Sequence, residues 1–359
     1  MPHAERDYPM KFGRREQVAR AWLGGSVLGA ALACANERPQ HDAPSAPAAE
    51  LRTPARPTAS GPPVSVAEPS DAEPSGRTDS LDVPQLSAGG GSQRPSSPDK
   101  VRFVAIGDYG WSGEAERQTS ELVAGLQPDF VITTGDNNYP IGSAATIDEN
   151  IGQYFSDFIY PYQGSYGSTA TENRFFPSLG NHDWGTPGAQ PYLDYFTLPG
   201  NERYYEFVRG SVHFFAIDSD YREPDGITAD SAQAKWLHRQ LAASSAAFRV
   251  VYMHHPPYSS GPHGDTEQLK WPYAAWGADL VVAGHDHCYE RMSKDGITYV
   301  VSGLGGASIY SFNVEVEGSV ARYNDQYGVT VFEADDRELS IAFITIDGEL
   351  VDQATLGAR

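Results

Sequence analysis

Short apolar runs that end abruptly in polar residues recur between residues 101 and 287. Each run holds about four to six residues, most of them β-branched or aromatic, as buried strands do. Because ligands of open α/β sheets gather beyond the carboxyl ends of the strands, we expect the polar residues after these runs to meet at one rim. The segments with this pattern are VRFVAIGDYG, DFVITTGDNNY, FFPSLGNHD, VVYMHHPPY and DLVVAGHDH. The polar residues that they deliver are Asp108, Asp136, Tyr139, Asn181, His182, His254, His285 and His287.

A helix is predicted between the first two runs. Ser112 is its candidate N-cap, and Glu114 and Glu116 follow in the first turn, where negative charge is favourable beside the positive end of the helix dipole. Apolar residues then fall mostly on one face until Gln127-Pro128 ends the helix. A parallel crossover of this kind places residues 130–133 beside residues 101–106.

The rest of the pattern alternates helical and strand segments. Residues 141–173 predict a helix around 149–158 and then a long loop over the rim, which is the best candidate for substrate selectivity. A hairpin turning at Arg209-Gly210 precedes AQAKWLHRQLAAS, whose apolar spacing predicts a helix packed on a sheet face. Further strand segments follow residue 297, and the last is a hairpin around Asp347-Gly348. The order indicates an α/β fold of two facing sheets with helices outside.

The first 34 residues have the features of an export signal. A basic start with Arg14 and Arg15 precedes the apolar stretch AWLGGSVLGAALA, which is too short to span a bilayer as a stable helix. ALAC resembles a bacterial lipoprotein box, in which Cys34 would be acylated, although Leu32 stands one place late. Simple secretion after an Ala-x-Ala site is the alternative. We expect an exported protein that is membrane-anchored through Cys34 or else periplasmic or extracellular. The paired arginines are also a weak indication of twin-arginine export.

Residues 35–98 are dominated by Pro, Ala, Ser and Gly, with almost no aromatic residue. Such a segment cannot bury enough apolar surface to offset the entropy of ordering it, so we expect a disordered linker. A linker behind an acylated cysteine would hold a catalytic domain off the membrane. The catalytic domain is predicted to comprise residues 99–359.

The charge balance is strongly acidic. The chain has 26 Lys and Arg against 47 Asp and Glu, for a formal net charge of -21. This excess argues against nucleic acid or anionic lipid as a partner held by bulk charge. It also repels phosphate esters, so a phosphate site here needs its own local positive charge, which bound metal cations would supply. Cys34 and Cys288 are the only cysteines, so the chain has no disulfide framework.

The ordered motifs GDYG, GDNNY, GNHD, the histidine of VYMHH and GHDH resemble those of the calcineurin-like metallophosphoesterase superfamily. The tyrosine three residues after Asp136 resembles that of the purple acid phosphatase branch, and the compact domain looks like the small, tartrate-resistant type. The resemblance covers roughly residues 100–345. It implies a four-layer αββα sandwich.

The resemblance also implies two metal positions. Cations about 3.5 to 4 Å apart can clamp a phosphoryl group for in-line displacement, and N/O ligands suit Fe, Zn and Mn alike. A phenolate ligand implies Fe(III) at the tyrosine-containing position, with Fe, Zn or Mn as the second, divalent metal. The implied ligands are Asp108, Tyr139 and His287 for the first metal, Asn181, His254 and His285 for the second, and Asp136 as the bridge.

Two adjacent histidines compete for one ligand position. From composition alone, either His254 or His255 could be the ligand. The position of Pro256 matches the spacing that the family shows after the residue beyond its ligand, and this favours His254.

Three further residues are candidates for catalysis. His182, next to Asn181, and His263, in HHPPYSSGPHGD, resemble the family's histidines that stabilise the transition state and protonate the leaving oxygen. Asp183 is a candidate for orienting His182, or it caps a turn.

These features predict a binuclear-metal acid phosphatase that hydrolyses phosphate monoesters by attack of a metal-bound hydroxide. A phosphodiesterase or nucleotidase on the same scaffold is the alternative within enzymes. A non-catalytic surface binding protein that keeps its metals is the alternative from another class.

Overall fold

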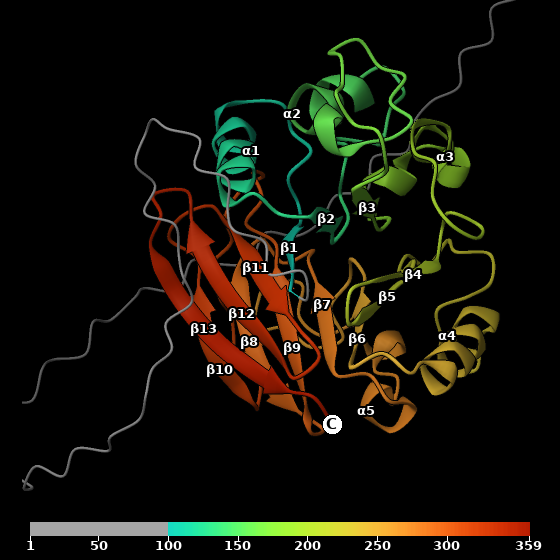
Figure 1. Cartoon of the computed structure of the whole chain (residues 1–359), viewed down its shortest axis with the longest axis vertical. Coiled ribbons are helices and arrows are strands. Elements are labelled where there is room, and N and C mark those ends of the chain that lie inside the picture. Colours follow the sequence, from blue (N-terminus) through green and yellow to red (C-terminus); the bar gives the residue numbers. More distant parts are fainter. Residues whose placement is uncertain (1–99) are drawn as a thin grey trace, which may run out of the picture. The chain divides into compact units, whose positions relative to one another are not determined.

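The computed structural model of the chain describes residues 100–359. The predicted export signal at 1–34, the possible lipid anchor at Cys34 and the linker at 35–98 lie outside the described residues. Two mixed sheets form the body of the described part, and helices lie on their outer faces (Figure 1). The predicted four-layer αββα sandwich is therefore confirmed.

The first sheet contains six strands in the order β13-β12-β11-β1-β2-β3. One half is parallel, because helical crossovers join its strands, and the other half is a meander of antiparallel hairpins. The strand β1 pairs with β2 in parallel, as the crossover predicted. The strands are β1 (Val101–Ile106), β2 (Phe130–Thr133), β3 (Phe175–Pro177), β11 (Gly328–Ala334), β12 (Glu338–Thr345) and β13 (Leu350–Gly357).

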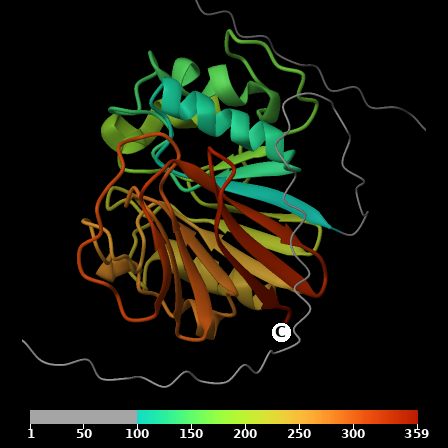
Figure 2. The same cartoon turned by 90° about the vertical axis from the view of Figure 1, so that its left-hand side faces the viewer.

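The second sheet contains seven strands in the order β10-β8-β9-β7-β6-β5-β4. Its centre, β5-β6-β7-β9, is parallel, and antiparallel strands complete it on both sides. Figure 2 shows how the strands of the two sheets are layered against each other. The strands are β4 (Tyr205–Arg209), β5 (Val212–Ala216), β6 (Phe248–Tyr252), β7 (Leu280–Ala283), β8 (Tyr289–Lys294), β9 (Ile297–Ser302) and β10 (Ser319–Tyr323).

Aromatic side chains fill the space between the two sheets. Phe103 of β1 is fully buried and stacks on Phe130 and Phe332 of the neighbouring strands. Its ring also meets Phe214 of the second sheet edge to face, with centroids 4.8 Å apart. Such pairs add to the free energy gained from burial, so this cluster fixes one sheet against the other.

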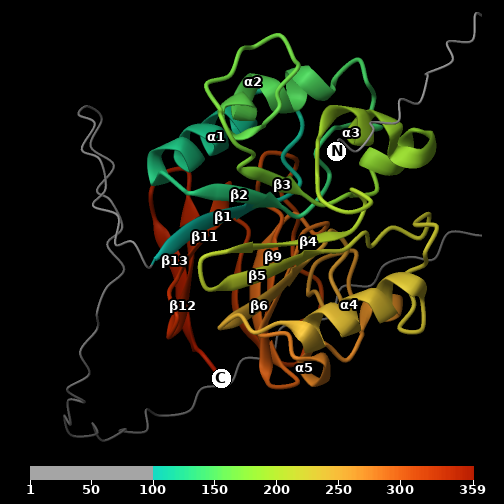
Figure 3. The ribbon, with the colours of Figure 1, turned by 45° about the vertical axis from the view of Figure 1, so that its right-hand side comes forward.

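Helices cover both outer faces, as Figure 3 shows. Those on the first sheet are α1 (Glu114–Leu126), α2 (Gln153–Phe155) and α3 (Gln190–Tyr195), and those on the second are α4 (Ala232–Ala243) and α5 (Tyr273–Trp276). Single helical turns occur at Asp148–Gly152, Ser156–Phe158, Asp183–Gly185, Pro187–Ala189 and Glu267–Leu269. The helix expected around residues 149–158 is thus divided into three short pieces.

The ends of α1 show one wrong prediction and one correct one. Ser112 does not cap the helix: Gly113 occupies the N-cap position without a side-chain bond, and the Ser112 hydroxyl lies 3.1 Å from the Tyr154 hydroxyl. At the other end, Gln127 adopts the left-handed conformation, and its N–H donates to the Ala124 carbonyl. Both features terminate the helix at Gln127-Pro128, where the sequence predicted its end.

The helix α4 forms where its periodicity predicted it. Ser231 caps it by accepting a hydrogen bond from the Ala234 N–H, and Leu237 and Leu241 are buried against the second sheet. The hairpins β4-β5 and β12-β13 also lie where they were predicted. Among residues 100–359, no helix is both long and apolar enough to cross a membrane.

Candidate metal centre

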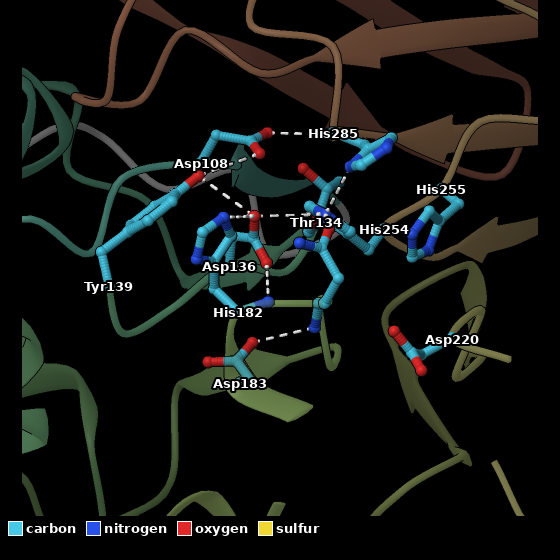
Figure 4. Close-up of polar contacts among 12 residues, drawn as sticks. Asp108, Thr134, Asp136, Tyr139, His182, Asp183, Asp220, His254, His255 and His285 are labelled. Atoms are coloured by element: carbon cyan, nitrogen blue, oxygen red, sulfur yellow. Dashed lines mark hydrogen bonds and ion pairs between the residues drawn. The ribbon is translucent and has the colours of Figure 1, made fainter. Parts of the chain in front are cut away.

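Five strand ends, three from the first sheet and two from the second, deliver polar side chains to one region (Figure 4). The eight polar residues predicted at the rim all lie on these ends or on the loops that follow them. After β1 comes Asp108, after β2 come Asp136 and Tyr139, after β3 come Asn181 and His182, after β6 comes His254, and after β7 come His285 and His287.

Three of these residues have a backbone conformation that L-residues rarely adopt. The φ angles of Asp108, Asp136 and His285 are 55°, 52° and 68°. Each follows a glycine, and Gly284 shows why: a Cβ there would lie 2.7 Å from Asp108 Oδ2. Strained conformations cost about 1–3 kcal/mol each and cluster at functional sites, where the surroundings enforce them.

An acidic and phenolic group of ligand atoms forms one side of the centre. The Tyr139 hydroxyl lies 3.1 Å from Asp136 Oδ2, 3.4 Å from Asp108 Oδ1 and 3.3 Å from His287 Nε2. His287 Nε2 is also 3.3 Å from Asp108 Oδ1. These are the residues that the family resemblance implies for the first metal, together with Asp136, which it implies as the bridge.

An imidazole and amide group forms the other side. His254 Nε2 lies 2.9 Å from Asn181 Oδ1, 3.1 Å from His285 Nδ1 and 3.3 Å from Asp136 Oδ2. The same carboxylate oxygen of Asp136 therefore faces both Tyr139 and His254. This is the position that a bridging ligand requires.

Hydrogen bonds between Nδ1 and backbone carbonyls fix the orientation of two imidazole rings. His254 Nδ1 pairs with the Thr134 carbonyl at 2.8 Å, and His287 Nδ1 pairs with the Ser308 carbonyl at 2.5 Å. A ring nitrogen bonded to a carbonyl must carry a proton, so in the neutral imidazole the lone pair is on Nε2, which faces the centre. Histidines that bind metals are oriented in this way.

The donor atoms fit hard or borderline cations. Asp108, Asp136 and His254 are at most 1% exposed, and one ligand atom from each lies within 4.8 Å of the others. His254, His255 and His285 form a second group with the same spacing. Buried carboxylates cost much free energy unless positive charge compensates them, which bound cations would do.

Without bound cations, protons on neighbouring groups compensate the negative charge of the buried carboxylates, as two pKa shifts indicate. Burial raises the pKa of the Tyr139 hydroxyl, and Asp136 and Asp108 raise it further. Burial by itself lowers the pKa of His254, but the attraction of Asp136 outweighs it and raises the pKa to about 10. A cation would displace these protons, because ligands bind metals in their deprotonated forms.

The two histidines predicted for catalysis lie on opposite sides of the ligand cluster. The centroid of the His182 ring lies 4.2 Å from that of the Tyr139 ring, and His182 Nδ1 lies 2.6 Å from the Pro140 carbonyl. The ring of His263 is 4.1 Å from that of His285 and is exposed. Its backbone N–H donates to Asp286 Oδ1 at 2.9 Å, which fixes the start of its loop.

Asp183 is buried and does not hold the His182 ring. Its Oδ2 accepts hydrogen bonds from the Gly180 N–H at 2.8 Å and from the side-chain amide of Asn137 at 2.8 Å. Burial raises its pKa to about 7, and the charge of Asp136 contributes. Of the two roles predicted for Asp183, these contacts fit the cap of a turn, since Pro140 is the partner of His182.

Sequence reasoning missed the segment that follows β5. Ser219 contacts His255, and Asp220 binds the guanidinium of Arg222. Arg222 also donates to the backbone carbonyls of Trp184 and Asn181, so it supports the loop that carries the predicted amide ligand. The strand-end rule would have found Ser219 and Asp220, because AIDSD follows an apolar run in the same way.

The fold and the site define a protein of the metallophosphoesterase type. The family model described as calcineurin-like phosphoesterase matches residues 101–289, and the chain belongs to this family. The match covers the five motifs from GDYG to GHDH.

The chain is a distant homologue of the purple and tartrate-resistant acid phosphatases. Purple acid phosphatase 17 of Arabidopsis thaliana is 29% identical over 242 residues, which are 58% of this chain and 69% of that protein. Tartrate-resistant acid phosphatase type 5 of Rattus norvegicus is 24% identical over 304 residues, which are 72% of this chain and 91% of that protein.

Solved structures show the same fold. Purple acid phosphatase PPD1 from yellow lupin seeds has a TM-score of 0.58 at 18% identity, over 72% of this chain and 54% of that one. GAP50 of Plasmodium, described as the anchor in the inner membrane complex, has a TM-score of 0.58 at 18% identity, over 73% of this chain and 90% of that one. At such identities the likeness concerns the fold alone.

Proposed function

We propose that the protein is an acid phosphatase that hydrolyses phosphate monoesters at a centre of two metal ions. The observation that carries the proposal is the position of Tyr139. Its hydroxyl lies within 3.4 Å of Asp108, Asp136 and His287, so the phenol is part of the ligand cluster itself. The distant purple acid phosphatase relatives support the same choice.

Bound cations would supply the positive charge that the acidic chain lacks, and they would activate water for attack on phosphorus. The residues of the chain do the remaining work. His182 and His263 stand on either side of the ligand cluster, where a phosphoryl group held at the centre would meet both rings. We assign to them the stabilisation of the phosphoryl oxygens and the protonation of the leaving oxygen.

The completeness of the donor set favours an enzyme over a binding protein that keeps its metals. All seven predicted ligands lie on the five strand ends, and the fully buried His254 faces both the amide of Asn181 and the carboxylate of Asp136. Protein that hydrolyses no phosphate ester at full metal occupancy would favour the binding protein. A comparison of a monoester with a bis-ester of one phenol separates the two enzyme classes, since a strong preference for the bis-ester would indicate a phosphodiesterase.

We expect Tyr139→Phe to remove a visible absorption band from the purified protein. A phenolate is a strong donor to Fe(III), so the proposed iron site predicts a charge-transfer band in the wild type. The measurement is an absorption spectrum with metal analysis of the same sample. Tyr310→Phe is the matched control, because this ring stacks on His287 at 4.0 Å but was not predicted as a ligand. Wild type loaded with Fe(III) but without such a band would contradict the assignment of Tyr139 as an iron ligand.

His182→Ala and His263→Ala should each lower kcat for a phosphate monoester by about 10²- to 10³-fold, because proton transfer by a positioned side chain typically contributes that much. The metal content should stay at the wild-type value. For an ester with a very acidic leaving group, the variant that has lost the general acid should recover most of its kcat. A loss of metal in proportion to the loss of rate would instead show that the histidine holds the centre together.

A further inference from the structure

His255, the histidine set aside in favour of His254, lies at the same centre. Its ring centroid is 4.3 Å from that of His285 and 4.9 Å from that of His254. One ring nitrogen from each of the three histidines lies within 4.8 Å of the others. Figure 4 shows the ring of His255 beside His254, on the side away from Tyr139.

A buried hydroxyl fixes the orientation of the His255 ring. The backbone N–H of His255 donates to Ser219 Oγ at 2.8 Å, and the same Oγ lies 2.9 Å from His255 Nδ1. Ser219 is 2% exposed and follows β5, a strand whose end carries no predicted ligand. The ring therefore has one nitrogen fixed by an oxygen, as His254 has through Thr134 and His287 has through Ser308.

The other ring nitrogen of His255 has no hydrogen-bond partner within residues 100–359. His255 is half-buried, and this nitrogen is not sealed from solvent, so a cation can reach it. Nitrogen ligands lie about 2.0–2.1 Å from zinc, so adjacent ligands of one cation are roughly 3–4 Å apart. The 3.1 Å between His254 Nε2 and His285 Nδ1 fits this spacing.

We propose that His255 is a third imidazole ligand of the second metal, beside His254 and His285, and that Ser219 is the positioning residue that aims it. The inference rests on the proposed binuclear centre and extends it. With Asn181 and the bridging Asp136, the second position then has three nitrogen and two oxygen donors. Nitrogen-rich sets suit Zn(II) and Fe(II) better than Mn(II) or Mg(II), so we expect zinc or ferrous iron at this position.

The test compares zinc binding by the full-length wild type and by His255→Phe, which keeps the ring but removes both nitrogens. Metal is stripped with a chelator, and zinc is titrated back in competition with a chromophoric chelator. We expect two binding steps in the wild type and a weakening of one step by at least about 100-fold in His255→Phe. Changes in the outer shell alone typically cost 10- to 100-fold, so Ser219→Ala should weaken the same step by about 10-fold.

Two further variants keep the result interpretable. His238→Phe removes a histidine that stacks on Trp276 of the outer helix α5, and it should bind zinc as the wild type does. His255→Gln covers the case in which the phenylalanine variant does not fold, and the metal-free melting temperature of each protein checks this. Cobalt(II) substitution adds a spectroscopic readout, because loss of a nitrogen ligand shifts the visible d–d bands of the cobalt protein.

The outcomes separate this inference from the proposed function. Wild-type zinc affinity and an unchanged cobalt spectrum in His255→Phe would overturn the ligand role. A raised KM alone would then assign the ring to contact with the phosphoryl group. Neither unchanged zinc binding nor a raised KM in His255→Phe would contradict the proposed binuclear centre. A wild type that shows no second zinc-binding step would instead contradict the centre itself.

Discussion

Asp136→Asn is expected to lower kcat/KM for a phosphate monoester by at least about 10³-fold, the upper end of the cost of removing one preorganised electrostatic contact. Oδ2 of Asp136 faces the Tyr139 hydroxyl at 3.1 Å and His254 Nε2 at 3.3 Å, so this one atom lies between the two halves of the ligand cluster. The asparagine amide at the same place offers a metal at most one weak oxygen ligand and no negative charge. Both predicted metal positions would lose a ligand at once.

The substitution keeps the shape of the side chain, so the fold should survive. Asp136 Oδ1 accepts a hydrogen bond from the His182 N–H at 2.9 Å, and the amide oxygen of asparagine can accept the same bond. The measurement pairs steady-state kinetics with metal analysis by mass spectrometry, and bound metal should fall below one ion per chain. Asp194→Asn, on the exposed side of α3, is the matched control and should keep wild-type values. Two retained metals with a rate within 10-fold of wild type would refute the bridging role.

The gathering of these polar residues at one rim could be predicted because their positions at strand ends are coded locally, whereas their roles as metal ligands were implied by the family resemblance. A buried strand, a glycine and a polar residue recur, and the sheet topology brings the ends of such strands together. At Asp108 and Asp136 the glycine precedes a residue with positive φ, and a Cβ at Gly107 would lie 1.9 Å from Thr134 Oγ1. The glycine of the motif is thus required by the close approach of the strand ends, and the same approach brings the polar residues together.

Interactions between segments that are distant in the sequence were harder to predict. Asp183 binds Asn137 across 46 positions, and nothing near either residue in the sequence indicates the pairing. The choice between His254 and His255 assumed that only one of them reaches the centre. The parallel pairing of β5 with β6 brings Ser219 to His255, whose ring lies beside those of His254 and His285.

Burial of charge was the least predictable feature. Glu116 was predicted to lie in the first turn of α1, where its charge is favourable beside the positive end of the helix dipole. In the structure it shares the inner face of α1 with Thr119, Val123 and Leu126, and it is 0% exposed. The spacing of these four residues is helical, so the face could have been recognised, but glutamate is almost never fully buried unless it is paired.

Neither carboxylate oxygen of Glu116 has a hydrogen-bond partner among the described residues. Burial raises the pKa of Glu116 well above its ordinary value of 4.5. A pKa that is higher in the folded state than in the unfolded state gives stability that is complete below the unfolded pKa. This stability is lost as the pH rises from about 4.5 through the folded-state pKa, at no more than about 1.36 kcal/mol per pH unit.

Glu116→Met is therefore expected to stabilise the protein, and more so at pH 8 than at pH 4. Methionine fills a similar volume and needs no partner, so it removes an unsatisfied group that costs about 1–3 kcal/mol. At pH 8 the gain should exceed the gain at pH 4 by at least about 1.4 kcal/mol, the value of one unit of pKa shift. Urea unfolding of the metal-loaded wild type and variant between pH 4 and pH 9 measures the difference, in which the pH dependence of metal binding common to both proteins cancels.

Two matched variants identify the cause of the gain. Glu116→Gln should remove the extra pH dependence but gain less stability, because its amide is left without partners in the same place. Glu121→Met alters an exposed carboxylate of the same helix, which pairs with Arg117, and it should change the free energy of unfolding by no more than about 0.5 kcal/mol at either pH. An equal gain for Glu116→Met at pH 4 and pH 8 would show that the pKa of Glu116 is not raised in the folded state, and a loss at both pH values would show that the carboxyl group stabilises the fold.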